Sequence, residues 1–196
     1  MIFNLATLHL GDVLMAMPAM RAGDSVVARP QHRVPGLPVD WLDSGNGLHA
    51  QHRPDQHVTG AWLELADREP VRHRLLPEVD RTLTVIAPDV AAPEKQWDKW
   101  EALQMELELP HAVRVGASLG REAWMALLNR AHTVICPDTG TAHMADALAV
   151  PKVIVLHGMG ETHFNTYAPF WNRDHCIVRD SMGDISVNHV MEALRG

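Results

Sequence analysis

The sequence predicts an α/β protein whose C-terminal half is a parallel β-sheet covered by helices on both faces, preceded by a reduced α/β N-terminal half. Three observations lead to this prediction. A chain of 196 residues with 46% hydrophobic content can form one large or two small globular domains. From residue 81 onward, short apolar runs alternate with segments of helical periodicity. Those runs are apolar throughout, which is typical of parallel strands that are buried on both faces.

The N-terminal half is expected to begin with a strand, a turn and a helix. Residues 1–7 are apolar, and residues 13–20 carry apolar side chains at helical spacing. Pro18 lies within this helix and predicts a kink or an early end. Residues 25–28 and 39–42 are two further candidate strands. The stretches between them are rich in Pro, Gly, Asn and His, so we expect this half to be sparsely built.

The C-terminal half is a regular alternation of expected strands and helices. The strands are residues 83–87, 112–115, 133–136, 152–156 and 176–178. The helices are residues 95–107, 121–131, 141–148 and 187–194. The change in character near residues 79–81 divides the chain into a reduced N-terminal domain, residues 1–80, and a C-terminal domain, residues 81–196.

Composition excludes several classes of protein. The formal net charge is −7, and neither half carries an excess of Lys and Arg over Asp and Glu. A nucleic-acid partner or an anionic membrane surface is therefore disfavoured. No apolar run approaches the roughly 20 residues of a membrane-spanning helix, and no basic region precedes the first apolar stretch. Because two cysteines, Cys136 and Cys176, are too few for a disulfide framework, we expect a cytoplasmic protein with reduced thiols.

The histidines do not form a recognisable metal motif. The chain has 13 of them, but they are scattered, without HExxH or paired Cys/His spacing. The sequence therefore predicts no metal site, and a metal-dependent hydrolase has no support in the spacing.

The most informative stretch is residues 133–158. Its first apolar strand ends in the letters PDTG, residues 137–140, directly before a helix, and its second runs into HGMG, residues 157–160. In an open parallel sheet, ligands bind beyond the carboxyl ends of the strands, and a glycine at a helix start lets backbone amides approach a phosphate. This loop and helix start could therefore bind a diphosphate through Thr139, Gly140 and Thr141.

A structural explanation of the same residues stays open. Asp138 or Thr139 could simply cap the helix that follows, as Asp and Thr very commonly do. His143, in the first turn of that helix, could contact a ligand or be a surface residue. The spacing alone does not decide between these alternatives.

Three short segments of the chain resemble the motifs of one known protein family. Residues 138–145 read DTGTAHMA, residues 94–97 read EKQW and residues 10–14 read LGDVL. Together they resemble the motifs of glycosyltransferase family 9, the ADP-heptose:lipopolysaccharide heptosyltransferases, with Met144 where Leu is usual. The resemblance covers nearly all of residues 83–160 and the beginning of the N-terminal half.

This resemblance implies a GT-B fold of two Rossmann-like domains, with the donor bound mainly to the second and the acceptor approaching from the first. It implies inverting transfer of a heptose-like sugar from a nucleotide-diphosphate sugar, with an ADP-sugar favoured, to a hydroxyl of a saccharide or lipopolysaccharide-core acceptor. No cofactor and no metal are implied.

The resemblance also assigns roles to residues. Asp12 would be the catalytic base, since an Asp within hydrogen-bond reach of a hydroxyl can take its proton. A Lys and a helix N-terminus can stabilise a leaving diphosphate without a metal. The residues implied for the donor and its diphosphate are Lys95, Asp138, Thr139, Gly140, Thr141 and His143. The residues expected to border the cleft are Gly11, Met159 and Gly160. The adenine and ribose are expected over the loop after residues 83–87 and against residues 116–118.

The N-terminal half departs from the family, whose acceptor domain is a considerably longer Rossmann unit. Several arginines could grip an anionic acceptor, although nearby acids nearly cancel their charge; these are Arg29, Arg33, Arg53, Arg72 and Arg74. A transferase is favoured, including one that acts on a small or unusual acceptor. The alternative is a non-catalytic nucleotide or nucleotide-sugar binding module. A transferase needs Asp12 to face the donor cleft. A reduced half could also expose apolar surface that a second copy covers in a homodimer.

Overall fold

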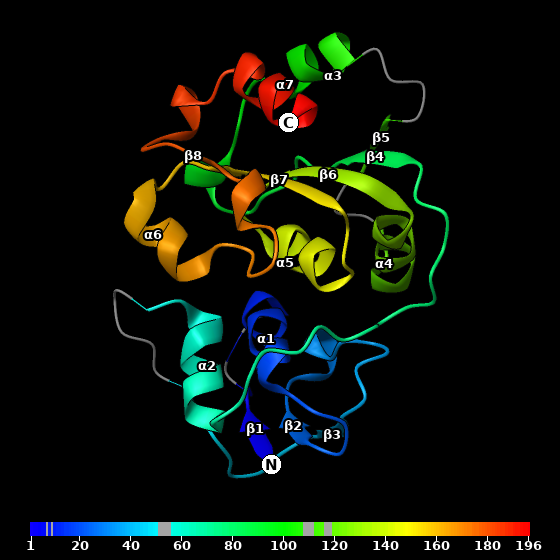
Figure 1. Cartoon of the computed structure of the whole chain (residues 1–196), viewed down its shortest axis with the longest axis vertical. Helices are drawn as coiled ribbons and strands as arrows, with labels where there is room; N and C mark the ends of the chain where they lie inside the picture. The colour runs from blue at the N-terminus through cyan, green and yellow to red at the C-terminus, as the bar shows by residue number, and fades with distance from the viewer. Residues whose placement is uncertain (7, 9, 51–55, 108–111, 116–118) are drawn as a thin grey trace.

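Two parallel β-sheets organise the chain (Figure 1). The computed structural model describes residues 1–6, 8, 10–50, 56–107, 112–115 and 119–196. Within these ranges, the N-terminal sheet has the order β1-β2-β3 and the C-terminal sheet the order β5-β4-β6-β7-β8. Every strand pair is parallel, so the predicted α/β class is confirmed.

The strands lie where the apolar runs predicted them. The N-terminal sheet consists of β1 (Ile2–Asn4), β2 (Ser25–Val27) and β3 (Asp40–Leu42). The C-terminal sheet consists of β4 (Leu83–Ile86), β5 (Ala112–Arg114), β6 (Ala131–Pro137), β7 (Lys152–His157) and β8 (Ile177–Val178).

Helices cover both faces of the C-terminal sheet (Figure 1). On one face lie α3 (Trp100–Leu107) and α7 (Val187–Arg195), and on the other α4 (Arg121–Asn129) and α5 (Gly140–Ala147). Because side chains of a strand alternate between faces, Val134 of β6 packs in one apolar core and Ile135 in the other. Both faces of the sheet are therefore buried, which explains why these strands are apolar throughout.

The N-terminal helix ends early, as Pro18 predicted. Helix α1 (Leu10–Ala16) stops at Ala16, and Met17–Ala19 continue as a 3₁₀ turn with Pro18 inside it. A proline lacks the N–H of the α-helical ladder, so it forces this change. Helix α1 packs against α5, and one apolar core runs from Phe3 in β1 through to Val155 in β7.

The helix expected over residues 95–107 was predicted too long. Pro93–Lys95 form a separate 3₁₀ turn, and α3 begins only at Trp100. The buried Trp97 lies between them, where its Nε1–H donates to the Ile185 carbonyl oxygen at 2.9 Å. This long-range hydrogen bond, near the start of α7, fixes Trp97 outside the helix.

Two helices were not expected, α2 (Val58–Ala66) and α6 (Gly160–Tyr167). Helix α2 packs on α1 and ends at Asp67 in the left-handed conformation, with φ of 52°. Helix α6 follows β7 and buries only Thr166, so its sequence shows no apolar stripe. None of the described helices has the length and apolar character needed to cross a membrane.

Candidate functional site

The site is centred on Asp138, at the carboxyl end of β6. Its carboxylate is buried, and the Lys95 ammonium donates to its Oδ2 at 2.8 Å and to its backbone oxygen at 3.0 Å. Burial alone would raise the pKa of Asp138, but His143 and Lys95 more than offset it and lower that pKa. Because burial lowers the pKa of His143, Lys95 is the cation that balances the carboxylate near neutral pH.

Lys95 reaches this carboxylate from a turn on a neighbouring strand connection. It ends the 3₁₀ turn that follows β4, and β4 lies beside β6 in the sheet. The predicted Lys-x-Trp and Asp-Thr-Gly segments therefore meet at the carboxyl edge of the sheet. This is where ligands bind in open parallel sheets.

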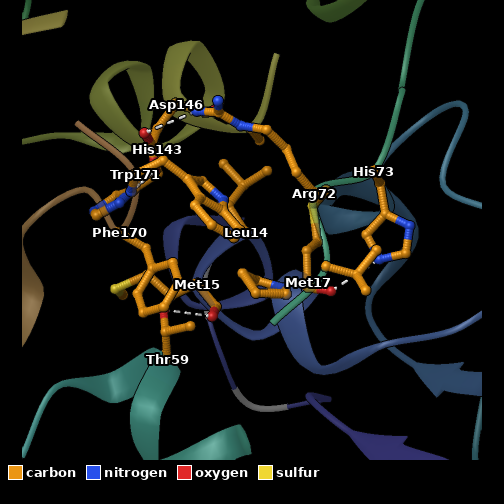
Figure 2. A pocket seen from close by; sticks show the side chains of 13 residues that line it. Leu14, Met15, Met17, Thr59, Arg72, His73, His143, Asp146, Phe170 and Trp171 are labelled. Carbon is orange, nitrogen blue, oxygen red and sulfur yellow. Dashed lines mark hydrogen bonds and ion pairs between the residues drawn. The ribbon is translucent and has the colours of Figure 1, made fainter. Parts of the chain in front are cut away.

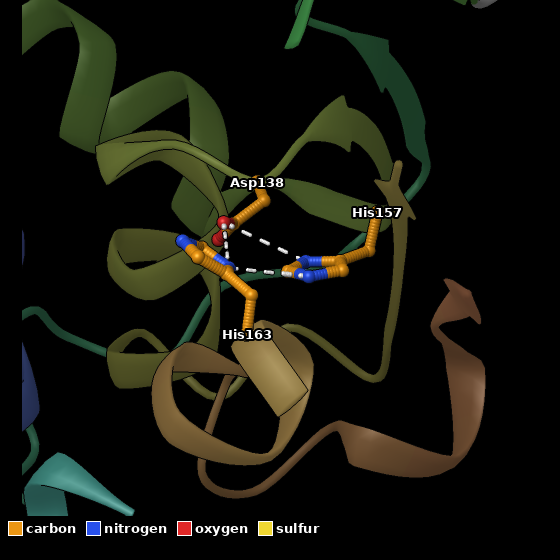
Figure 3. Close-up of side chains that lie close together, drawn as sticks. All are labelled: Asp138, His157 and His163. Carbon is orange, nitrogen blue, oxygen red and sulfur yellow. Dashed lines mark hydrogen bonds and ion pairs between the residues drawn. The ribbon is translucent and has the colours of Figure 1, made fainter. Parts of the chain in front are cut away.

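Two histidines that the sequence analysis did not assign complete the surroundings of Asp138 (Figure 3). His157 Nδ1, at the end of β7, lies 3.6 Å from Asp138 Oδ2, and His163 Nδ1, on α6, lies 3.7 Å from it. His163 Nδ1 is also 3.2 Å from His157 Nε2. Burial is the main cause that lowers the pKa of His157, to about 4, and it lowers the pKa of His163 as well.

At the start of α5, the structure shows a helix cap and also leaves room for a ligand. Thr139 caps the helix, since its Oγ1 accepts from the Thr141 N–H at 3.3 Å. Asp138 does not act as that cap and pairs with Lys95 instead. At Gly140, an added Cβ would have no protein atom within 4 Å. Packing therefore does not require glycine there, and the open space at the helix N-terminus suits a ligand.

The Gly11–Asp12 segment lies against the same edge from the N-terminal half. A Cβ built on Gly11 would lie 3.6 Å from Cδ2 of His143, on α5. The Asp12 carboxylate is close enough to influence His143, whose pKa it raises in opposition to the dominant effect of burial. His143 is buried between the two halves, and its Nε2 lies 4.0 Å from Asp138 Oδ1. Asp12, His143 and Asp138 thus form one electrostatic group.

Two hollows adjoin this edge. One, of about 310 Å³, is lined by Leu10, Ala87, Asp89, Val115, Leu119, Arg121, Trp124 and Thr141. The other, of about 440 Å³, is lined by Pro88, Asp89, Val90, Ala91, Gln96, Trp97, Trp100 and Arg114. They meet at Asp89, in the loop after β4 where the adenine and ribose were expected. The other segment expected there, residues 116–118, lies outside the described residues.

Met159 and Gly160 lie at the start of α6 rather than in the lining of these two hollows. Met159 precedes the helix, and Gly160 has a positive φ of 73°, which favours glycine. The backbone of Gly160 contacts His157. These two residues therefore set the direction of α6, which carries His163.

A smaller cavity between the two halves cannot hold a nucleotide (Figure 2). Its volume of about 20 Å³ has room for one water molecule. Arg72 crosses above it, donating to the Asp146 backbone oxygen at 3.0 Å, with its guanidinium over the Trp171 ring at 5.2 Å. This region is a packed contact between the halves.

Four of the five arginines considered for an acceptor lie in the described part of the chain and have partners there. Arg33 pairs with Asp43 at 2.5 Å and Arg74 with Glu78 at 3.2 Å. Arg29 donates to the Ala6 carbonyl oxygen. Arg72 is engaged by Asp146, and Arg53 lies outside the described residues. These arginines do not form a ready-made anion site in the described part of the chain.

Part of the chain matches a known protein family. Residues 101–188 match the family description "Glycosyltransferase family 9 (heptosyltransferase)". This match contains the Asp-Thr-Gly segment, whereas Asp12 and Lys95 lie outside it. A search of curated proteins found no match to the sequence.

Solved structures share the fold of the whole chain. A glycosyl transferase family 9 protein from Veillonella parvula is 14% identical with a TM-score of 0.71, over 99% of this chain and 95% of that one. Heptosyltransferase WaaC of E. coli, solved with ADP-2-deoxy-2-fluoro heptose, is 13% identical with a TM-score of 0.67, over 99% and 98%. ADP-heptose LPS heptosyltransferase II of E. coli is 14% identical with a TM-score of 0.68, over 99% and 97%.

At these identities the solved structures show the fold alone, and the family pattern of residues 101–188 adds the sequence evidence. The two agree with the Asp-Thr-Gly segment at the start of α5 and with the parallel sheets on either side of the α1–α5 contact. Residues 101–188 therefore match glycosyltransferase family 9, and the whole chain shares the fold of these solved glycosyltransferases.

Proposed function

We propose that the protein transfers a heptose-like sugar from an ADP-sugar to a saccharide hydroxyl, with inversion at the anomeric carbon. The observation that supports this most is the meeting of three separate segments at one edge, with Gly11–Asp12 on one side and Lys95 and Asp138–Thr141 on the other. WaaC was solved with an ADP-heptose analogue, which favours ADP and a heptose for the donor here.

In this proposal the N-terminus of α5 and Lys95 hold the donor diphosphate. The first-turn amides of α5 and the open space at Gly140 would receive the phosphate oxygens. Lys95, whose side chain is partly exposed, would add its charge as the bond between the anomeric carbon and the diphosphate oxygen breaks. The nucleoside would extend along the loop after β4.

Asp12 would act as the base. The acceptor hydroxyl oxygen attacks the anomeric carbon while its proton passes to the Asp12 carboxylate, and the nucleoside diphosphate leaves. Asp138, already paired with Lys95, would face the sugar hydroxyls or hold the loop in shape. No cofactor takes part in this scheme.

Calorimetric titration with ADP, UDP and GDP tests the donor site. We expect selective binding of ADP, weakened about 10- to 100-fold in Lys95→Ala, because a hydrogen bond to a charged group contributes about 1.5–3 kcal/mol. Lys152→Ala is the matched control, since Lys152 lies at the opposite end of the sheet strands and donates to Ala193 and Leu194. Absence of binding to all three nucleotides would overturn the proposal.

Asp12→Asn separates a transferase from a binding module. We expect ADP release from ADP-heptose with a lipopolysaccharide-core acceptor to fall about 100- to 10,000-fold, with ADP affinity unchanged. Asp40→Asn, at an exposed carboxylate of β3, is the control. A wild-type protein that binds ADP but transfers no sugar to any acceptor tested would be the binding module. Self-association through the N-terminal half stays a prediction, which a solution mass measurement would decide.

A further inference from the structure

We propose that Asp138, His157 and His163 form a binding site for a divalent transition-metal ion of the Zn²⁺ class. This inference goes beyond the proposed glycosyl transfer and stands without it. The sequence predicted no metal site, because the three residues lie on β6, β7 and α6 and their spacing matches no metal motif. The fold brings them together (Figure 3).

The spacing of the three ligand atoms fits a coordination shell. The Asp138 Oδ2 atom lies 3.6 Å from His157 Nδ1 and 3.7 Å from His163 Nδ1. Both distances are too long for hydrogen bonds. Zinc binds nitrogen and carboxylate oxygen at about 2.0–2.1 Å, which places neighbouring ligand atoms of a tetrahedron about 3.3 Å apart. One ligand atom from each residue can be chosen so that all three lie within 4.8 Å of one another.

Neighbouring aromatic rings pack against the two histidines, and solvent reaches part of the cluster. Asp138 and His157 are buried, whereas the His163 side chain is 24% exposed. The His163 ring lies against Tyr167 with centroids 4.7 Å apart, and the His157 ring meets the edge of Phe164 at 5.6 Å. Three protein ligands and an accessible fourth position are typical of zinc sites that bind water or a substrate.

Lys95 would compete with a metal ion for the Asp138 carboxylate. Its ammonium already donates to the same Asp138 Oδ2 that faces both histidines. A bound cation would share or displace this contact, and the repulsion between the two positive charges would weaken metal binding. Neutralising Lys95 should therefore tighten the site, which a merely structural Asp–His cluster would not show.

Titration of the full chain with Co²⁺, after removal of metals with EDTA and without nucleotide, tests the proposal by visible absorption. We expect one equivalent to bind, with affinity falling about 100-fold or more in His163→Ala and Asp138→Asn, since loss of outer partners alone costs about 10- to 100-fold. Lys95→Met should bind more tightly. His132→Ala, at an exposed histidine near the start of β6, should leave the affinity unchanged.

Thermal unfolding with and without Zn²⁺ provides a second measurement, because a ligand that binds the folded chain raises its melting temperature. We expect Zn²⁺ to stabilise the wild type and not His163→Ala. Equal Co²⁺ affinity in the wild type and His163→Ala, no binding by the wild type, or weaker binding in Lys95→Met would each overturn the site. ADP titrations in EDTA report on the donor site separately, so either proposal can fail alone.

Discussion

Asp24, Asp138 and Asp146 are buried carboxylates, and each has its own set of partners. Asp24 pairs with Arg68 and accepts the Arg21 N–H at 2.7 Å. Asp138 has Lys95 and the histidines, and Asp146 accepts from the Trp171 N–H and the Asn172 amide. A buried charge is costly without partners, so these contacts decide whether each carboxylate stabilises the fold.

Asp24→Asn should destabilise the protein by about 1–3 kcal/mol at neutral pH, because Arg68 loses its charged acceptor. Burial would raise the pKa of Asp24, but Arg68 and the Arg21 N–H lower it from 3.8 to about 2. The carboxylate therefore contributes its full stability above pH 3.8 and loses it as the pH falls towards 2. Urea unfolding of the wild type and Asp24→Asn, at pH 7 and in steps below pH 4, should show that their difference in unfolding free energy shrinks as the pH falls. A difference that stays constant would contradict this prediction.

The start of α5 shows how one element serves two purposes. The Thr139 side chain accepts from the Thr141 N–H and the Thr139 carbonyl oxygen accepts from the Ala142 N–H, while open space adjoins the helix start at Gly140. The helix is short, so this end depends on its cap and on packing against α1 and α4.

Gly140→Val should fold with nearly unchanged stability yet lose at least about tenfold in ADP affinity. The added side chain meets no protein atom within 4 Å, but it would fill the space proposed for the diphosphate. Gly60→Val, in α2 of the N-terminal half, would meet only His57 Cβ at 4.0 Å and is the matched control. Melting temperature and ADP calorimetry on both variants measure the two effects. Normal ADP binding by Gly140→Val would place the diphosphate elsewhere.

The two sheets share one continuous core through the α1–α5 contact. Polar contacts cross the same boundary, from Arg121 to the Arg33 carbonyl and from His57 to the Ala168 carbonyl. Because apolar and polar contacts both cross it, we expect the halves to unfold together.

Asp146→Ala should lower stability by about 1–3 kcal/mol and keep a single transition. The change removes the acceptors of the Trp171 N–H and the Asn172 amide and the ion-pair partner of Arg72. Calorimetry together with tryptophan fluorescence would measure this, with Asp174→Ala, at an exposed carboxylate, as the control. Two separate transitions would show that the halves are independent.

Elements with local signals could be predicted from the sequence. The apolar runs located the strands, Pro18 ended α1, and the letters PDTG located the start of α5. These signals work because a strand buried on both faces, a proline and a helix cap each act within a few residues. The division at residues 80 and 81 and the roles of the site residues stay predictions.

The side chains that surround Asp138 could not be predicted from the sequence, because the fold brings them together from distant segments. Helix α6 has no apolar stripe, so His163 gave no local signal, and His157 resembled the end of any buried strand. Trp97 lies outside its expected helix because it donates a hydrogen bond to the carbonyl oxygen of Ile185, far along the chain. In each case, long connections between parallel strands bring distant residues together, at the carboxyl ends of the strands or across the sheet. No sequence spacing encodes that proximity.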